Sequence, residues 1–67
     1  MGPPTKPDSP VGQGLTDKVV QGWKENPSRG AGEVAYETLV ESGMLPMDAR
    51  RLSGDYMQSA RGKWSRR

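Results

Sequence analysis

The sequence predicts an all-α protein, a small domain of three to four helices that follows a disordered N-terminal arm. Apolar side chains between residues 15 and 64 recur at steps of three or four residues, which is the spacing of one helix face. Pro27 and Gly43 divide this stretch at points where helices commonly end. Only 31% of the 67 residues are hydrophobic, so we expect one small core. The expected organisation is an arm at 1–14, a helical domain at 15–64 and a basic tail at 65–67.

The arm at 1–14 contains four prolines and three glycines and almost nothing that a core could bury. Such a composition cannot offset the entropy cost of its own ordering, so we expect the arm to be disordered. We expect the first helix to take Thr16 as its N-cap and to run through Glu25. Pro27 requires this helix to stop by Asn26.

The segment from Glu33 to Ser42 is the strongest helix prediction, because its apolar residues form one stripe along a helix. Gly43 can adopt the positive φ that ends many helices. A further helix is expected from near Pro46 to about Lys63, and a glycine at position 54 leaves open whether this stretch is one helix or two. Its inward candidates are Ala49, Leu52, Tyr56, Ala60 and Trp64. The expected core residues are Leu15, Val19, Val20, Trp23, Val34, Ala35, Leu39, Val40, Leu52, Tyr56 and Met57.

The segment from Thr38 to Leu52 has the spacing of a helix-turn-helix, in which a second helix presents side chains to DNA. In that arrangement Met44 fills the corner between the helices, while Arg50 and Arg51 project outward. Guanidinium groups suit guanine edges and phosphate oxygens, so the placement is chemically sensible. A plain helical hairpin has the same pattern and remains the alternative.

Histidine and cysteine are both absent, which removes the usual general base, the usual nucleophile and most transition-metal ligands. We therefore expect no catalysis, no metal and no cofactor, and no small-molecule substrate is indicated. Glu33, Glu37 and Glu41 lie four residues apart, and we expect them to form a solvated face. Without cysteines, a signal peptide or a membrane-spanning stretch, a cytoplasmic location is expected.

The leading functional hypothesis is a DNA-binding regulator or accessory factor with a basic C-terminal half. Its predicted DNA-contacting residues are Met47, Arg50, Arg51, Arg61, Lys63, Arg66 and Arg67. Tyr56 and Trp64 lie among these residues, where they either stack on bases or close the core; for Tyr56 the core is favoured. The alternative is an inhibitor or adaptor that docks on a larger protein through Glu33, Glu37 and Glu41 or through an apolar surface. A structural subunit that orders within a complex and a homodimer are also left open.

Overall fold

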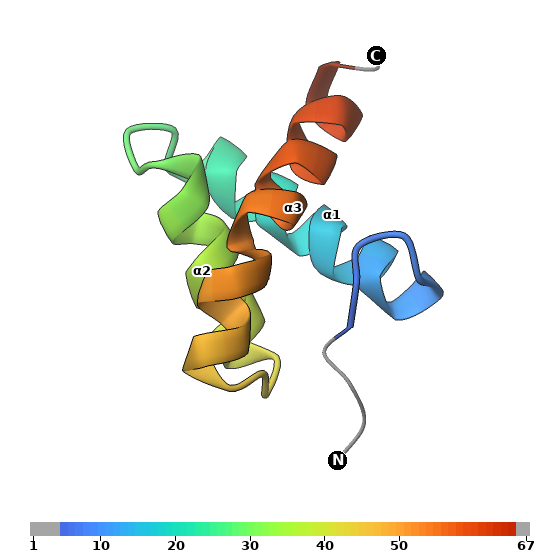
Figure 1. Cartoon of the computed structure of the whole chain (residues 1–67). Helices are drawn as coiled ribbons and strands as arrows, with labels where there is room; N and C mark the ends of the chain where they lie inside the picture. The colour runs from blue at the N-terminus through green and yellow to red at the C-terminus, as the bar shows by residue number, and fades with distance from the viewer. Residues whose placement is uncertain (1–4, 66–67) are drawn as a thin grey trace.

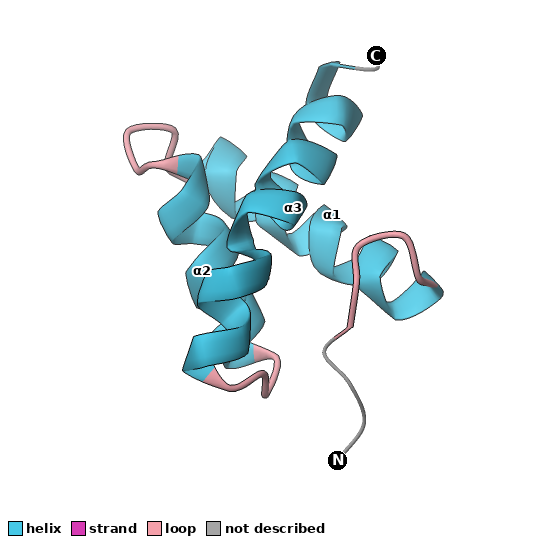
Figure 2. Ribbon diagram, in the orientation of Figure 1, coloured by secondary structure: helices cyan, strands magenta, loops and turns pink. Residues whose placement is uncertain are grey.

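The structure, a computed structural model, describes residues 5–65, and this part of the chain consists of three helices joined by loops. These helices are α1 (Pro10–Glu25), α2 (Ala31–Glu41) and α3 (Pro46–Ser65). Figure 1 shows α3 running back beside α2 while α1 lies across the pair, and each helix contacts the other two. Figure 2 shows helices and loops only among the described residues. The predicted all-α class is confirmed, with three helices.

The core lies where the three helices meet, and its largest fully buried apolar side chains are Tyr56, Leu39 and Val19, one from each helix. Alanines at positions 35, 49 and 60 are also fully buried, so they fill little space and let the helices approach closely. The complete buried apolar set is Leu15, Val19, Val34, Ala35, Leu39, Ala49, Leu52, Tyr56 and Ala60. Val20, Trp23 and Val40 of the predicted core lie at its edge, half-buried, and Met57 is half-buried. The inward spacing predicted for α3 is confirmed by these residues up to Ala60.

Helix α2 ends in a Schellman motif built around Gly43. Gly43 has φ 105°, and its N–H donates to the Val40 carbonyl at 3.0 Å. The Met44 N–H donates to the Leu39 carbonyl at 3.1 Å, and the Met44 side chain packs against the core. The predicted glycine stop and the predicted plug at Met44 are therefore both found.

The α2–α3 pair has the appearance of a helical hairpin, because α3 doubles back beside α2 in Figure 1. The helix-turn-helix crossing expected for residues 38–52 is not confirmed. The turn between the helices is short, and α3 is buried against the rest of the molecule as far along as Ala60. The long buried stripe of α3 explains this arrangement, since it can be covered only if α3 lies along its neighbours.

Helix α1 begins at Pro10, so the arm expected at 1–14 is not confirmed: residues 10–14 are helical, and residues 1–4 lie outside the described residues. Ser9 is the N-cap, and its hydroxyl accepts a hydrogen bond from the Gly12 N–H at 3.0 Å. Pro10 occupies the first helical position, where its missing N–H costs nothing. Thr16, the predicted cap, lies inside the helix and donates to the Gly12 carbonyl at 3.0 Å.

The loop before α1 folds back over the helix. A Cβ atom added to Gly12 would lie 1.8 Å from the Lys6 carbonyl oxygen, so only glycine allows this approach. The Ser9 hydroxyl donates to the same carbonyl at 2.8 Å. The Tyr56 hydroxyl donates to the Thr5 carbonyl at 2.7 Å, which ties the loop to α3. The loop is therefore part of the folded structure from Thr5 onward.

Helix α3 is continuous through Gly54, so the break that the sequence left open does not occur. The Ser53 hydroxyl donates to the Arg50 carbonyl at 2.9 Å and caps no new helix. Glycine in a helix interior costs about 1 kcal/mol relative to alanine. Burial of Leu52 and Tyr56 on either side of Gly54 offsets that cost, since each large apolar side chain contributes about 1.5–3 kcal/mol.

A glycine pair in α1 tests the close approach of the N-terminal loop. We expect Gly12→Ala to destabilise the fold by about 1–3 kcal/mol, because its methyl group collides with the Lys6 carbonyl. Gly14→Ala is the control: nothing lies within 4 Å of its Cβ position, so it should stabilise by about 0.5–1 kcal/mol. Urea unfolding followed by circular dichroism measures both. Equal effects of the two substitutions would contradict the observed loop position.

The core assignment is tested in α2 and α3. We expect Leu39→Ala and Leu52→Ala each to cost about 2–4 kcal/mol, because each leaves a cavity among the three helices. Leu45→Ala should change stability by less than about 0.5 kcal/mol, since Leu45 is 53% exposed. Thermal unfolding compares the three variants. An unchanged transition for either core variant would show that the core lies elsewhere.

Candidate nucleic-acid interface

One side of α3 faces away from α1 and α2 and carries three arginines. The buried residues Ala49, Leu52, Tyr56 and Ala60 mark the inward side of α3. Successive residues turn by about 100° around a helix axis, so the residues about 180° away from this set lie on the opposite side. We call the exposed residues on that opposite side the outward face, and the exposed carboxylate of Asp55, four residues after Arg51, lies at its margin. The outward face consists of Met47, Arg50, Arg51, Gly54, Gln58, Arg61 and Gly62.

The arginines at the N-terminal end of the outward face differ in their surroundings. The Arg50 guanidinium carbon lies 5.2 Å from the centre of the Tyr36 ring, a cation–π contact that orients the side chain without neutralising its charge. Among the described residues, neither Arg50 nor Arg51 forms an ion pair. Both guanidinium groups are therefore available to an anion from solution.

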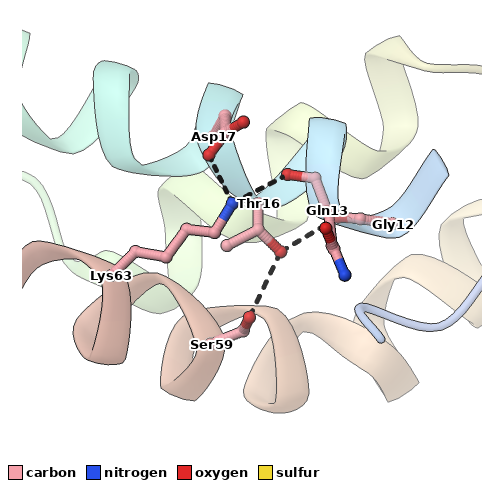
Figure 3. Close-up of polar contacts among 6 residues, drawn as sticks. All are labelled: Gly12, Gln13, Thr16, Asp17, Ser59 and Lys63. Carbon is pink, nitrogen blue, oxygen red and sulfur yellow. Dashed lines mark hydrogen bonds and ion pairs between the residues drawn. The ribbon is translucent and has the colours of Figure 1, made fainter. Parts of the chain in front are cut away.

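Lys63, also predicted to contact DNA, does not belong to the outward face. Its Nζ atom lies 2.6 Å from an Asp17 carboxylate oxygen and donates to the Gln13 carbonyl at 3.4 Å (Figure 3). In the same view the Thr16 and Ser59 hydroxyl oxygens lie 3.4 Å apart in a hydrogen bond between α1 and α3. Lys63 thus joins the two helices.

The predicted DNA-contacting residues are therefore divided by the structure. Met47, Arg50, Arg51 and Arg61 share the outward face, and all four are exposed. Lys63 lies apart from them beside α1. The remaining two, at positions 66 and 67, lie outside the described residues. The outward face is the only part of the predicted site that the described residues bring together.

Two of the three glutamates on α2 share one cation. Arg29, in the loop before α2, pairs with Glu33 at 3.1 Å and also with Glu37. Hydrogen bonds to Glu37 and then Glu33 raise the pKa of Arg29 above its ordinary value. Sequence reasoning missed this cluster, although Arg29 stands four residues before Glu33, the spacing of a helical ion pair. The acidic helix is therefore partly neutralised within its own molecule.

A shallow groove between α1 and α2 lies beside this cluster. Glu25 and Glu41 line it together with Lys18, Thr38 and Gln21, and its lining residues come from α1, α2 and the turn after α2. The described residues hold no group of three or more acidic, histidine or cysteine side chains arranged to bind a metal ion. The groove is thus an acidic surface with no ligand geometry of its own. None of the three helices has the length and apolar character needed to cross a bilayer.

The two aromatic residues of α3 have different environments. Trp64 is half-buried and meets Trp23 edge-on, with ring centroids 4.8 Å apart and planes at 81°. The Lys24 Nζ atom lies 5.7 Å from the centre of the Trp64 ring. Tyr56 is fully buried, so the core role favoured from the sequence is the one observed.

The Tyr56 hydroxyl provides a pH-dependent test of its burial. Burial, and secondarily the charge of Asp8, raises the pKa of Tyr56 above its ordinary value. The folded state thus prefers the neutral phenol, so stability is complete below pH about 10 and falls as the pH rises through the raised pKa. We expect Tyr56→Phe to lose about 1 kcal/mol at pH 7, because the Thr5 carbonyl loses its donor, and to decline less at alkaline pH.

Urea unfolding at pH 7 and at alkaline pH, for the natural protein and the Tyr56→Phe variant, measures both effects. Tyr36→Phe controls for the removal of a phenol in general, because Tyr36 lies at the edge of the core. Parallel losses of stability in the natural protein and in Tyr56→Phe would show that Tyr56 does not titrate in this way.

The outward face combines three exposed arginines, one of them oriented over Tyr36, with a single carboxylate, Asp55, at its margin, and this excess of positive charge suits a surface that binds anions. Comparisons with protein-family models, with curated proteins and with solved structures find no match for this chain.

Proposed function

We propose that the protein is a small, non-catalytic DNA-binding regulator or accessory factor that contacts the phosphate backbone through the outward face of α3. The observation that carries the proposal is the gathering of Arg50, Arg51 and Arg61 on one exposed side of α3, where arginines outnumber the one marginal carboxylate, Asp55. Nucleic acids are the polyanions for which such a surface is suited, because each neutralised phosphate releases bound counterions.

The dimensions of the outward face support this proposal. Arg50 and Arg61 are eleven residues apart, about 16 Å along a helix axis. The major groove of DNA is about 12 Å wide, so a helix side of this length spans the groove. Gly54 and Gly62 have open space around their Cβ positions, so no side chain there holds the backbone away from a partner.

The proposal is tested with a charge-matched pair of double variants. We expect Arg50→Ala/Arg51→Ala to weaken the binding of duplex DNA. If both arginines contact phosphates, the slope of log affinity against log salt concentration should become shallower by up to about two units. Lys6→Ala/Lys18→Ala removes the same charge from exposed positions outside α3 and should leave most of the affinity. Fluorescence anisotropy with a labelled duplex at two salt concentrations measures both, and circular dichroism checks the folding.

Two outcomes would contradict the proposal. One is full affinity of a folded arginine variant, which would exclude the outward face as the contact. The other is equal weakening by both double variants, which would mean that only net charge matters. Glu33→Gln/Glu37→Gln should leave the DNA affinity unchanged or slightly higher, because it removes negative charge from the molecule.

A second candidate function, docking on a larger protein, is favoured by a different observation. Leu45 and Met47, at the corner between α2 and α3, are large apolar side chains that are 53% and 75% exposed. Binding to such a surface depends weakly on salt. Leu45→Ser would weaken a protein contact and leave the binding of duplex DNA nearly intact, because Leu45 lies outside the outward face. A partner retained from cell extract after nuclease treatment, and lost with this variant, would favour protein docking.

A further inference from the structure

Trp64 lies beside the C-terminal end of the outward face. It follows Arg61 by three residues, which places it about 60° around the helix from that arginine. Its ring is half-buried and is held by the edge-on contact with Trp23, at a centroid distance of 4.8 Å. The orientation of the ring is thus held by packing between α1 and α3, while part of the residue remains exposed.

The Lys24 side chain of α1 lies over the Trp64 ring. The Lys24 Nζ atom lies 5.7 Å from the ring centre, close to the outer limit of about 6 Å for a cation–π contact. Lys24 is exposed and has a long flexible side chain, so it can leave the ring at little cost. A flat π-system can then take its place, and the displaced ammonium lies where it can bind a phosphate attached to that group.

We propose that Trp64 is a stacking platform for an unpaired base, with Lys24 binding the phosphate of the same nucleotide. This inference rests on the proposed function: the outward face holds the duplex, and Trp64 holds the first base beyond its end. The preferred ligand is therefore DNA in which a duplex continues into a single strand. Every base has a π-face, so the contact is independent of base sequence.

Trp64 is the aromatic residue best placed for this role. The chain has two tryptophans, two tyrosines and no phenylalanine. Tyr56 is fully buried in the core, and the ring of Tyr36 is covered by Arg50. Trp23 packs against the core and supports the Trp64 ring. In a duplex every base is already stacked on its neighbours, so a platform at this position adds affinity only where a base is unpaired.

The experiment compares two probes, a blunt DNA duplex and the same duplex with a short thymidine overhang. We expect the natural protein to bind the overhang probe more tightly than the blunt duplex. Trp64→Leu should lower the affinity for the overhang probe by about tenfold or more. The affinity for the blunt duplex should not change. Tyr36→Leu is the matched control: it removes an aromatic ring away from Trp64, and it should not alter the preference between the probes.

Two further measurements keep the test decisive if Trp64→Leu does not fold. In Trp23→Phe the only tryptophan is Trp64, and its fluorescence should be quenched by the overhang probe and not by the blunt duplex. For the overhang probe, Lys24→Met should reduce the slope of log affinity against log salt concentration by about 0.7, the value for one single-strand phosphate contact. The slope for the blunt duplex should stay unchanged.

The outcomes separate the two proposals. Equal affinity for both probes, together with unquenched Trp64 fluorescence, would overturn the stacking inference while leaving DNA binding by the outward face intact. Failure to bind either probe at low salt would overturn the proposed function. Loss of the overhang preference in both Trp64→Leu and Lys24→Met, with Arg50→Ala/Arg51→Ala weakening both probes, would support the two proposals together.

Discussion

The burial of Tyr56 determines how the rest of this small protein is arranged. A phenol at the centre of a core needs an acceptor for its hydroxyl, because an unpaired buried polar group costs about 1–3 kcal/mol. The acceptor is the Thr5 carbonyl, so the N-terminal loop has to fold back across the molecule. That path brings the Lys6 carbonyl against α1, where only Gly12 leaves room, and it positions Ser9 to cap the helix. One buried hydroxyl therefore orders a segment that has almost no apolar surface of its own.

Elements specified by local signals could be predicted from the sequence, whereas those specified by distant contacts could not. The end of α2 at Gly43 and the inward spacing of α3 follow from backbone preference and periodicity, which act over a few residues. The N-terminal segment looked disordered because of its proline and glycine content. Its local signal, Ser9 followed by Pro10 in the first helical position, was present but was outweighed by composition. The hydrogen bond between the Tyr56 hydroxyl and the Thr5 carbonyl joins residues 51 positions apart, and no local sequence pattern predicts it.

The candidate site shows the same division. Helical periodicity alone places Arg50 and Arg51 on the exposed side of α3, so this part of the site could be predicted. Lys63 has the same charge and lies on the same helix, but its side chain pairs with Asp17 on α1. Which basic residues remain available depends on the packing of α3 against α1, and packing between helices cannot be read from the spacing within one of them.

The Arg29 cluster has a consequence for the kinetics of association. By pairing with Glu33 and Glu37, Arg29 weakens the electric field that α2 would otherwise project into solution. Glu25 and Glu41 line the α1–α2 groove on one part of the surface, and the exposed arginines of α3 lie on another. Under the proposed function, a polyanion that approaches within about 10 Å, the Debye length at 0.1 M salt, would experience a torque that turns α3 toward it. Encounters would therefore begin in a restricted range of orientations, which raises the association rate most at low ionic strength.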